Sequence, residues 1–576
     1  MTAMSGRIGR VMPRIIAMAG GALIVYQWAL ARPLWLDEEM IALNLRERGL
    51  LGLVGRLSLE TVAPYGWLVV ERLALVAFGT GEQVLRFFPM LFGLATIATA
   101  LWIGGRWLNA AGASILVLLC SFGQWITYFD VELKHYSADA CLALLLPALA
   151  VGAIELGADT DVEPGSDTGP TRVGPSYAYR YPYLYWWIAA AIGQLVANGA
   201  LFVTPACAVV IVTIAIRRGG PRAALRAAVP GIVWLAAFAV NYMVTLRHAQ
   251  GSEFLQGYWT FAFPPESAGT FGTVRWIGER LLPFAEKPGG AGFGVLFWIA
   301  SIGGFAVASG SQRLLALTCA TVPLSAFVLA AVRVVPFFER LALWVVPALY
   351  VGIALLGDRS VAALRSVGAI RSAGVIRLKP DPTDAASGFG TPIQIVALLI
   401  VVAVCGDITY HGLDDLRARP KNANHQLDDR AAVRWLAAQQ RPGDVWMTTR
   451  LALPALWWYH DSGADTILEA KYAPPGPDCR PGELRDTVKG SRRVIVYFGF
   501  RFDDVPRGFD DLLLERLGDI GSLVGYRPFA QMSRAVIVDL TEPSRHDRNA
   551  PVRPDATGED LRIKPDGCIA VQPARR

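Results

Sequence analysis

The sequence has few charged residues. Asp, Glu, Lys and Arg make up 18% of the 576 residues and 53% are hydrophobic, whereas soluble globular proteins carry about 25% charged residues. The apolar residues form runs that can cross a bilayer, for which roughly 20 residues suffice. Because backbone groups in lipid must be satisfied internally, such runs should be helices. The composition excludes an ordinary soluble protein and predicts a polytopic α-helical membrane protein.

The chain also lacks a basic domain. The net charge is +6, but residues 409–576 hold 25 Lys and Arg against 24 Asp and Glu. The positive excess lies in the membrane part, where it serves as a topology signal. The tail contains no GxGxxG and no P-loop, which disfavours nucleotide binding, and the chain shows no internal repeat. We therefore expect no nucleic-acid partner.

Cysteine is scarce outside the apolar runs. Five of the seven cysteines fall in hydrophobic segments, where small buried thiols are ordinary. The other two, Cys479 and Cys568, lie in the tail. They form a disulfide if the tail is extracytoplasmic, or they remain two free thiols.

The apolar runs define a topology. The first run is too long for a signal peptide and is expected to be an uncleaved helix with its N-terminus inside. Residues 65–79 carry Glu71 and Arg72 and are expected to lie at the membrane surface. We predict eleven spans, at residues 13–31, 84–104, 111–128, 136–156, 183–197, 200–216, 226–245, 290–308, 314–332, 338–356 and 392–408.

Arginine positions give an orientation. They cluster at the ends that this topology places in the cytoplasm, as the positive-inside rule requires, while the loop 32–83 has five Arg and seven acids and is expected outside. Residues 409–576 then lie outside too. The stretches 157–176 and 371–390 are rich in Gly, Pro, Asp and Ser and are expected to be disordered cytoplasmic linkers.

The tail has a different character. "DDRAAVRWLAAQQ" and "FDDLLLERLGDI" read as helices, and "DVWMTTR", "SRRVIVYFGF" and "RAVIVDL" read as strands. Because helices and strands alternate, a small α/β domain is expected. The predicted organisation is a transmembrane domain over residues 1–408 and an extracytoplasmic α/β domain over 409–576.

Charged residues gather in three outer loops near membrane level. At a bilayer centre each charge would cost about 2.5–3.5 kcal/mol, and at an interface or in a water-filled cavity this cost falls. The three clusters are Asp37, Glu38 and Glu39; then Asp130, Glu132, Lys134, His135, Tyr136 and Asp139; then Arg333, Glu339 and Arg340.

Each cluster also has a purely structural interpretation. Acids at 37–39 can favour a helix N-terminus by about 0.3–1 kcal/mol, which is the role expected for Glu39. The second cluster can be an interfacial group of salt bridges, with His135 as a hydrogen-bonding anchor. Glu339 and Arg340 can form an ion pair, and Arg333 can snorkel.

Together the clusters favour one functional site. An acid can act as a general base or hold a divalent cation, for which oxygen ligands suit Mg or Mn. Lys134 and Arg340 can hold a phosphate. A base, an optional metal and phosphate-binding cations suit group transfer with a phosphorylated leaving group.

The order of these motifs resembles a known family. An apolar helix, "DEE", "APYGWLVVERLALVAFGTGEQVLRFFPMLFGL" and "DVELKHYSADA" follow one another. The order is similar to that of the protein O-mannosyltransferase-like glycosyltransferases of the GT-C fold, which include the bacterial lipid A aminoarabinose transferases. The resemblance covers about residues 10–356 and is clearest over 30–145.

The resemblance implies roles for individual residues. Asp37 and Glu38 match the family's Asp-Glu pair. Pro64, Gly81, Glu82 and Arg86 approximate its middle motif, and Glu132, Lys134 and Tyr136 its Glu-x-Arg-x-Tyr-like motif, with Lys in place of Arg and one Pro where two are common. Arg340 stands where a late loop contributes a cation.

The implied activity is transfer of a sugar from a polyprenyl-phosphate donor to a glycan, lipid or protein hydroxyl, with inversion, at the bacterial inner membrane. Asp37, then Glu38, would be catalytic. Lys134, Arg340 and Tyr136 would bind the donor phosphate, Asp130 and Glu132 would bind a metal or position Lys134, and His135, Arg86 and Glu339 are further candidates. The alternatives are a transporter or flippase, a membrane scaffold, and a ligase or polymerase that uses a polyprenyl-diphosphate donor.

Overall fold

The computed structural model describes residues 2–160, 182–372, 385–419, 427–460, 466–500, 508–541 and 568–574. The chain divides into two compact units. The first comprises residues 1–30 and 49–417, and the second comprises residues 31–48 and 418–576. The second unit therefore includes residues 31–48, which follow α1 (Thr2–Ala29) in the sequence.

The first unit is helical. Its elements are α1 (Thr2–Ala29), η1 (Leu51–Leu53), η2 (Ser58–Glu60), α3 (Tyr65–Phe78), α4 (Glu82–Leu85), α5 (Phe87–Trp107), α6 (Ala110–Phe122), α7 (Gln124–Phe129), α8 (Tyr136–Thr160), α9 (Pro182–Val196), α10 (Asn198–Ala228), η4 (Val229–Gly231), α11 (Ile232–Asn241), η5 (Tyr242–Leu246), α12 (Arg247–Gln250), α13 (Glu253–Tyr258), η6 (Thr260–Ala262), α14 (Gly269–Glu286), α15 (Gly294–Val307), α16 (Gln312–Ala331), η7 (Glu339–Val345), α17 (Val346–Ser372) and α18 (Ala385–Ala418).

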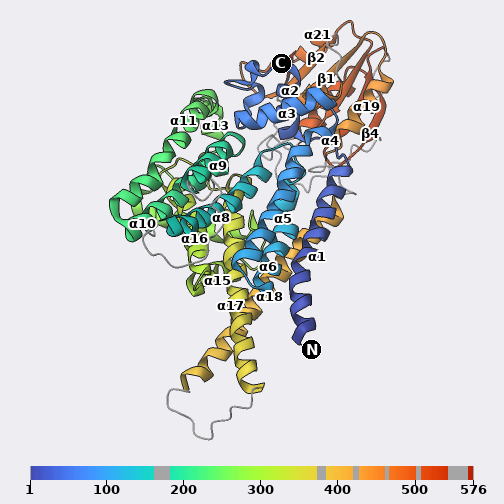
Figure 1. The fold of residues 1–576 in the computed structure, drawn as a ribbon. Coiled ribbons are helices and arrows are strands. Elements are labelled where there is room, and N and C mark those ends of the chain that lie inside the picture. The colour runs from blue at the N-terminus through green and yellow to red at the C-terminus, as the bar shows by residue number, and fades with distance from the viewer. Residues whose placement is uncertain are drawn as a thin grey trace. The chain divides into compact units, whose positions relative to one another are not determined.

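The helices pack as a bundle. Helix α5 lies beside α6 and α8, α6 packs on α1 and α17, and α10 packs on α8 (Figure 1). Several helix limits follow from local sequence. Helix α3 ends at Gly79, whose φ of 93° suits glycine, and α10 is interrupted at Gly219 and Gly220, just before Pro221.

The predicted spans all fall on helices of this bundle. Among the described residues, seven helical segments are long and apolar enough to cross a membrane, and they are Val11–Ala29, Phe87–Trp107, Tyr136–Gly157, Asn198–Leu246, Gln312–Ala331, Glu339–Arg365 and Pro392–Ala418. Asn198–Leu246 contains two of the predicted spans, and Ala110–Phe122 and Gly294–Val307 are shorter apolar helices. The chain is thus a multi-pass helical membrane protein, as the composition predicted.

Both predicted linkers lie largely outside the described residues. The parts of them that the structure describes, at 157–160, 371–372 and 385–390, are helical.

The second unit is an α/β domain with a six-stranded sheet. Its elements are α2 (Leu36–Glu47), α19 (Asp429–Gln439), β1 (Asp444–Thr449), η10 (Arg450–Ala452), α20 (Leu453–Tyr459), β2 (Ile467–Ala473), α21 (Glu483–Val488), β3 (Arg493–Phe498), α22 (Phe509–Gly518), β4 (Ser522–Pro528), β5 (Arg534–Asp539) and β6 (Cys568–Pro573). The strand order is β4-β5-β3-β1-β2-β6. Strand β1 is parallel to β2 and β3, and the other pairs are antiparallel.

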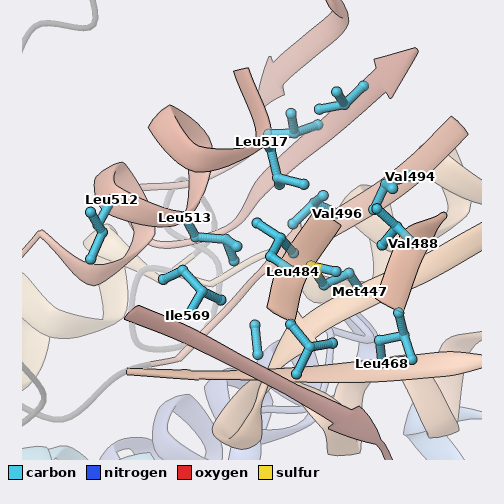
Figure 2. Close-up of a cluster of buried hydrophobic side chains, with 14 of the residues drawn as sticks. Met447, Leu468, Leu484, Val488, Val494, Val496, Leu512, Leu513, Leu517 and Ile569 are labelled. Atoms are coloured by element: carbon cyan, nitrogen blue, oxygen red, sulfur yellow. The ribbon is translucent and has the colours of Figure 1, made fainter. Parts of the chain in front are cut away.

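Side-chain alternation on β3 builds two cores. Val494 and Val496 face a cluster that includes Leu513 and Leu517 of α22 (Figure 2). Ile495 and Tyr497, on the opposite face of the strand, belong to the other cluster, with residues of α19 and α20. Every β3 residue is buried, as expected for a central strand covered on both faces. The predicted α/β domain is confirmed.

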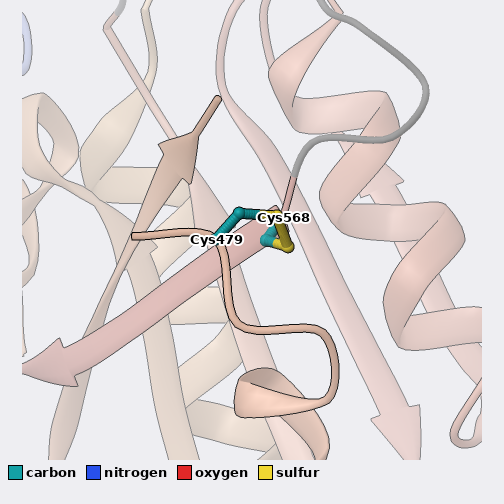
Figure 3. Close-up of a disulfide and its surroundings, with 2 residues drawn as sticks. All are labelled: Cys479 and Cys568. Atoms are coloured by element: carbon teal, nitrogen blue, oxygen red, sulfur yellow. A yellow bond between two sulfur atoms is a disulfide. The ribbon is translucent and has the colours of Figure 1, made fainter. Parts of the chain in front are cut away.

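Cys479 and Cys568 form a disulfide that joins β6 to the segment after β2 (Figure 3). The bond closes a separation of 89 residues. Of the two alternatives for these cysteines, the structure has the disulfide.

Candidate functional site

Helix α2 begins with the acids Asp37, Glu38 and Glu39. Glu38 is fully buried, and its Oε2 accepts a hydrogen bond from the backbone N–H of Trp35 at 3.1 Å. This is the reach-back half of a capping box, which satisfies a donor at the helix start. The carboxylate that matches the second acid of the family pair thus has a structural role at the helix N-terminus.

Glu39 does more than favour the helix start, so that expectation is wrong. Its side chain is 1% exposed and hydrogen-bonded to Asp429 of α19. The two residues are far apart in the sequence, and only the fold of the second unit brings the two carboxyl groups together.

Asp429 is the centre of a buried polar network. Its Oδ1 accepts hydrogen bonds from the Tyr497 hydroxyl and from the Ser533 hydroxyl. Burial raises the pKa of Asp429 to about 6. Burial, and then the negative charge of Asp429, raise the pKa of Glu39 well above its ordinary value. Glu39 therefore stays protonated, and its O–H donates a hydrogen bond to Asp429.

The rest of the 31–48 segment is fixed to the same domain. The Leu34 N–H donates to the Tyr459 hydroxyl at 2.8 Å. Arg46 donates to the carbonyls of Trp457 at 2.6 Å and Trp458 at 3.2 Å. Glu38 and Glu39 are buried and hydrogen-bonded within their own unit. Of the three acids, the half-buried Asp37 is the one that reaches the surface.

The second cluster lies in the first unit, at the start of α8. Asp130, Glu132, Lys134, His135 and Tyr136 are all buried, none more than 7% exposed. Two acids and an ammonium group in so small a buried segment carry a large desolvation cost. The Tyr136 ring packs between Phe129, at 4.9 Å, and His135, at 5.0 Å between ring centroids.

His135 is oriented by its neighbours. Its Nε2 lies 3.0 Å from Asn198 Nδ2 and 3.6 Å from Asp139 Oδ2. An amide nitrogen can only donate, so Nε2 accepts and the imidazole proton sits on Nδ1. Nδ1 is buried and has no hydrogen-bond partner among the described residues. Burial, and then Lys134, lower the pKa of His135 to about 3, so the ring is neutral.

Asp139 is a structural acid. Its Oδ1 accepts a hydrogen bond from the Gly199 N–H at 2.7 Å, at the start of α10. A Cβ on Gly199 would lie 2.7 Å from Trp344 Cβ and 3.1 Å from Asp139 Cβ. Glycine therefore lets α8, α10 and η7 meet closely at this point.

Asp130 packs against α5. A Cβ on Gly93 would lie 2.5 Å from Asp130 Cγ, so the absent side chain makes room for the carboxyl group. Arg86, at the start of α5, is 2% exposed. Gly93 is not among the predicted site residues, although a glycine within a predicted span indicates that another group can approach the helix closely.

The third cluster is divided between η7 and the segment before it. Element η7 begins with Glu339 and Arg340 and packs against α8 and α7. The Arg340 guanidinium carbon lies 5.9 Å from the Trp259 ring centroid. Arg333 instead donates to the Pro264 carbonyl and, at 3.2 Å, to Glu266. Asp37 and Glu38 belong to the second unit, whereas the other predicted site residues belong to the first.

Glu71 belongs to none of the three predicted clusters. It lies on the buried face of α3 with Trp67, and both carboxylate oxygens lack hydrogen-bond partners within the described chain. Burial raises its pKa well above the ordinary value, so it is neutral.

Within the described ranges, no three His, Cys, Asp or Glu side chains are grouped so that they could hold a metal. Asp130 and Glu132 would supply two carboxylates to the expected Mg or Mn ion, and Mg²⁺ is usually held by one or two carboxylates together with waters and substrate phosphates. The two acids would therefore suffice only together with a bound phosphate, and no reaction step is assigned to a metal.

The sequence matches no family model and no curated protein. Its backbone is similar to solved structures of ArnT from Cupriavidus metallidurans. The apo structure has 14% identity and a TM-score of 0.48, over 90% of this chain and 97% of that one. The structure bound to undecaprenyl phosphate has 13% identity and a TM-score of 0.49, over 91% and 97%.

Two other solved structures are similar. The archaeal oligosaccharyltransferase AglB from Archaeoglobus fulgidus, in complex with an inhibitory peptide and a dolichol-phosphate, has 11% identity and a TM-score of 0.43, over 92% of this chain and 74% of that one. The arabinofuranosyltransferase AftD from Mycobacteria has 13% identity and a TM-score of 0.37, over 92% and 40%. At such identities the likeness does not transfer roles between individual residues.

Proposed function

We propose that the protein is a membrane glycosyltransferase that moves a sugar from a polyprenyl-phosphate donor to an extracytoplasmic acceptor hydroxyl. The observation that carries this proposal is the buried charged cluster at the start of α8, packed against the η7 element that bears Arg340. A membrane protein rarely keeps such a cluster without a function, and the order of the motifs in this chain resembles that of GT-C glycosyltransferases.

In the proposed reaction Asp37 takes the proton of the acceptor hydroxyl. The acceptor oxygen attacks the anomeric carbon while the bond from that carbon to the phosphate oxygen breaks. The phosphate leaves with the bonding electron pair, and the anomeric configuration inverts. General-base catalysis of this kind contributes about 10²–10⁴-fold.

The cations stabilise the leaving group. Lys134 and Arg340 balance the charge that grows on the phosphate, and charge-assisted hydrogen bonds are the strong ones. Tyr136 and the Nδ1–H of His135 add neutral donors beside Lys134. Asp130 and Glu132 position Lys134, while Arg86 and Glu339 complete the surroundings. Glu38 supports Asp37 by capping α2.

The proposed location is the bacterial inner membrane, with the N-terminus in the cytoplasm and the C-terminal domain on the outer side. The disulfide between Cys479 and Cys568 supports this orientation, since disulfides persist in oxidising compartments.

A donor panel tests the proposal. Purified protein in nanodiscs is given polyprenyl-phosphate sugars, matched polyprenyl-diphosphate sugars and an extract of envelope acceptors, with and without EDTA. We expect transfer from the monophosphate donors, with inversion seen by NMR. Transfer from the diphosphate series alone would indicate a ligase or polymerase, and loss of activity in EDTA would restore a metal to the mechanism.

A further inference from the structure

A cleft with a charged rim opens in the first unit, beside the start of η7. It has a volume of about 130 Å³ and lies between the end of α14 and the segment that leads into η7. A cavity of about 150 Å³ in another protein binds benzene, so the cleft accommodates a group the size of a small ring. Its lining residues are Arg280, Pro283, Phe284, Glu286, Lys287, Phe337, Phe338 and Glu339.

The base of the cleft is aromatic and well supported. The rings of Phe284 and Phe337 are stacked, with centroids 5.0 Å apart and planes 12° apart, and both are buried. Trp298 packs behind Phe284 at 5.7 Å. Phe338 is less buried and contacts Phe261 at 5.0 Å. Because the rings of Phe284 and Phe337 are stacked and buried, the half-buried ring of Phe338 is the aromatic surface of the cleft that a ligand can reach.

The rim is charged but balanced. Arg280 and Lys287 contribute two positive charges, and Glu286 and Glu339 contribute two negative charges. Arg280 is held by a hydrogen bond of 3.2 Å to the Phe261 carbonyl and lies over the Trp276 ring. A balanced rim does not suit a bare phosphate or a metal ion. It suits hydroxyl groups, which accept from cations and donate to carboxylates.

The cleft adjoins the candidate transfer site. Glu339, on its rim, has a φ of 32°, a left-handed backbone that a non-glycine residue adopts only under constraint, often at functional sites. The next residue is Arg340, and η7 packs against α8, which follows Lys134. A ligand in the cleft would therefore lie beside η7, the element that carries Arg340.

We propose that this cleft binds one sugar ring, with an apolar ring face on Phe338 and with hydroxyl groups on Lys287, Arg280 and Glu339. The inference rests on the proposed function, since a sugar ring is the group transferred and is also present in glycan acceptors. The shared chemistry is the polyhydroxylated ring, and the test distinguishes the donor sugar from the acceptor sugar.

The test compares Lys287→Ala and Phe338→Ala with two matched controls on α14. Arg275 and Phe271 are exposed residues of α14 that lie outside the cleft. Arg275→Ala and Phe271→Ala are therefore the controls. The KM for a polyprenyl-phosphate sugar and the KM for the acceptor are measured separately in the full-length protein. Equilibrium binding of methyl glycosides to the same variants gives a readout that needs no turnover.

We expect the two cleft variants to raise one KM by roughly tenfold or more, with kcat within about threefold. Lys287→Ala removes hydrogen bonds to a charged group, and Phe338→Ala removes the apolar face on which the sugar ring packs. A raised donor KM identifies the donor sugar, and a raised acceptor KM the acceptor sugar. KM values equal to those of the controls, or a loss of kcat alone, would overturn the cleft assignment.

Failure of the proposed function gives a different result. If the wild-type protein transfers no sugar but binds methyl glycosides, and Lys287→Ala abolishes that binding, the cleft assignment stands and the transferase is wrong. If neither transfer nor glycoside binding is found, both are wrong. If Phe338→Ala does not fold, Lys287→Ala decides alone, because its side chain is exposed.

Discussion

Two segments of the chain, the start of α2 and the residues before α8, are similarly rich in buried acids but use them differently. In α2, Glu38 caps the helix and Glu39 shares a proton with Asp429, so two of three acids are accounted for inside their own unit. At the start of α8, Asp139 has the structural role, through the Gly199 N–H, while Asp130 and Glu132, just before the helix, are buried close in sequence to Lys134. The hydrogen-bond partner of an acid therefore distinguishes structural from candidate catalytic carboxylates better than the position of the acid in a motif does.

The largest expected effect is that of Asp37→Asn. Removing the proposed base should lower the transfer rate by about 10²–10⁴-fold with no change in unfolding temperature. Glu47→Gln is the matched control, because Glu47 is an exposed acid on the same helix. Equal transfer rates for the two variants would mean that Asp37 is not the base.

Lys134→Met should come next. Loss of one charged hydrogen bond to phosphate should cost about 1.5–3 kcal/mol and appear as a lower kcat/KM for the donor. Lys134→Arg should restore most of the activity, since guanidinium also pairs with phosphate. A Met variant as active as the Arg variant would remove Lys134 from the proposed site.

The Glu39–Asp429 pair predicts a pH-dependent stability of the second unit. Both pKa values are raised, that of Asp429 to about 6. The folded state thus holds protons that the unfolded state releases near pH 4. The contribution of this pair to stability should be highest near pH 4 and should fall by on the order of 1–3 kcal/mol as pH rises from about 4 through about 6. The check is thermal unfolding of the full-length protein between pH 4.5 and 8.5.

Glu39→Gln provides the control for that dependence. Its amide can donate to Asp429 without releasing a proton, so the fall in stability at high pH should become smaller. Glu47→Gln should leave it unchanged. If Glu39→Gln unfolds with the wild-type pH profile, the pair does not share a proton.

The smallest expected effect concerns Gly93. An alanine there would place Cβ 2.5 Å from Asp130 Cγ and should destabilise the first unit by about 1–3 kcal/mol. Gly105 lies on the same helix with no atom near its would-be Cβ, so Gly105→Ala should be neutral or stabilising by about 0.5–1 kcal/mol. Unfolding in detergent, followed by tryptophan fluorescence, measures both. Equal behaviour would mean that Asp130 is not fixed against α5.

Much of this architecture was predictable because local pattern determines it. The apolar runs gave the spans, and periodicity gave α19, α22, β1, β3 and β5. Strand β4 was missed because most of its residues are exposed, so it shows no alternation between buried and exposed positions. Strand β2, "ILEAKYA", interrupts its apolar residues with Glu469 and Lys471.

The site was less predictable because its contacts are long-range. The sequence suggests that "DVELKHY" and "FFER" act together, and this stays a prediction. It gave no sign that Glu39 would meet Asp429, or that Phe284 would stack on Phe337. Such pairs join segments that carry no common local pattern, and only tertiary packing brings them together.

The most direct test is a stoichiometry measured in proteoliposomes. Full-length protein is given a labelled polyprenyl-phosphate sugar and an acceptor, and both free polyprenyl phosphate and glycosylated acceptor are counted by mass spectrometry. A glycosyltransferase should release one polyprenyl phosphate for each acceptor modified, and Asp37→Asn should lower both together. Movement of the intact donor across the bilayer with no polyprenyl phosphate released would contradict the account and indicate a flippase.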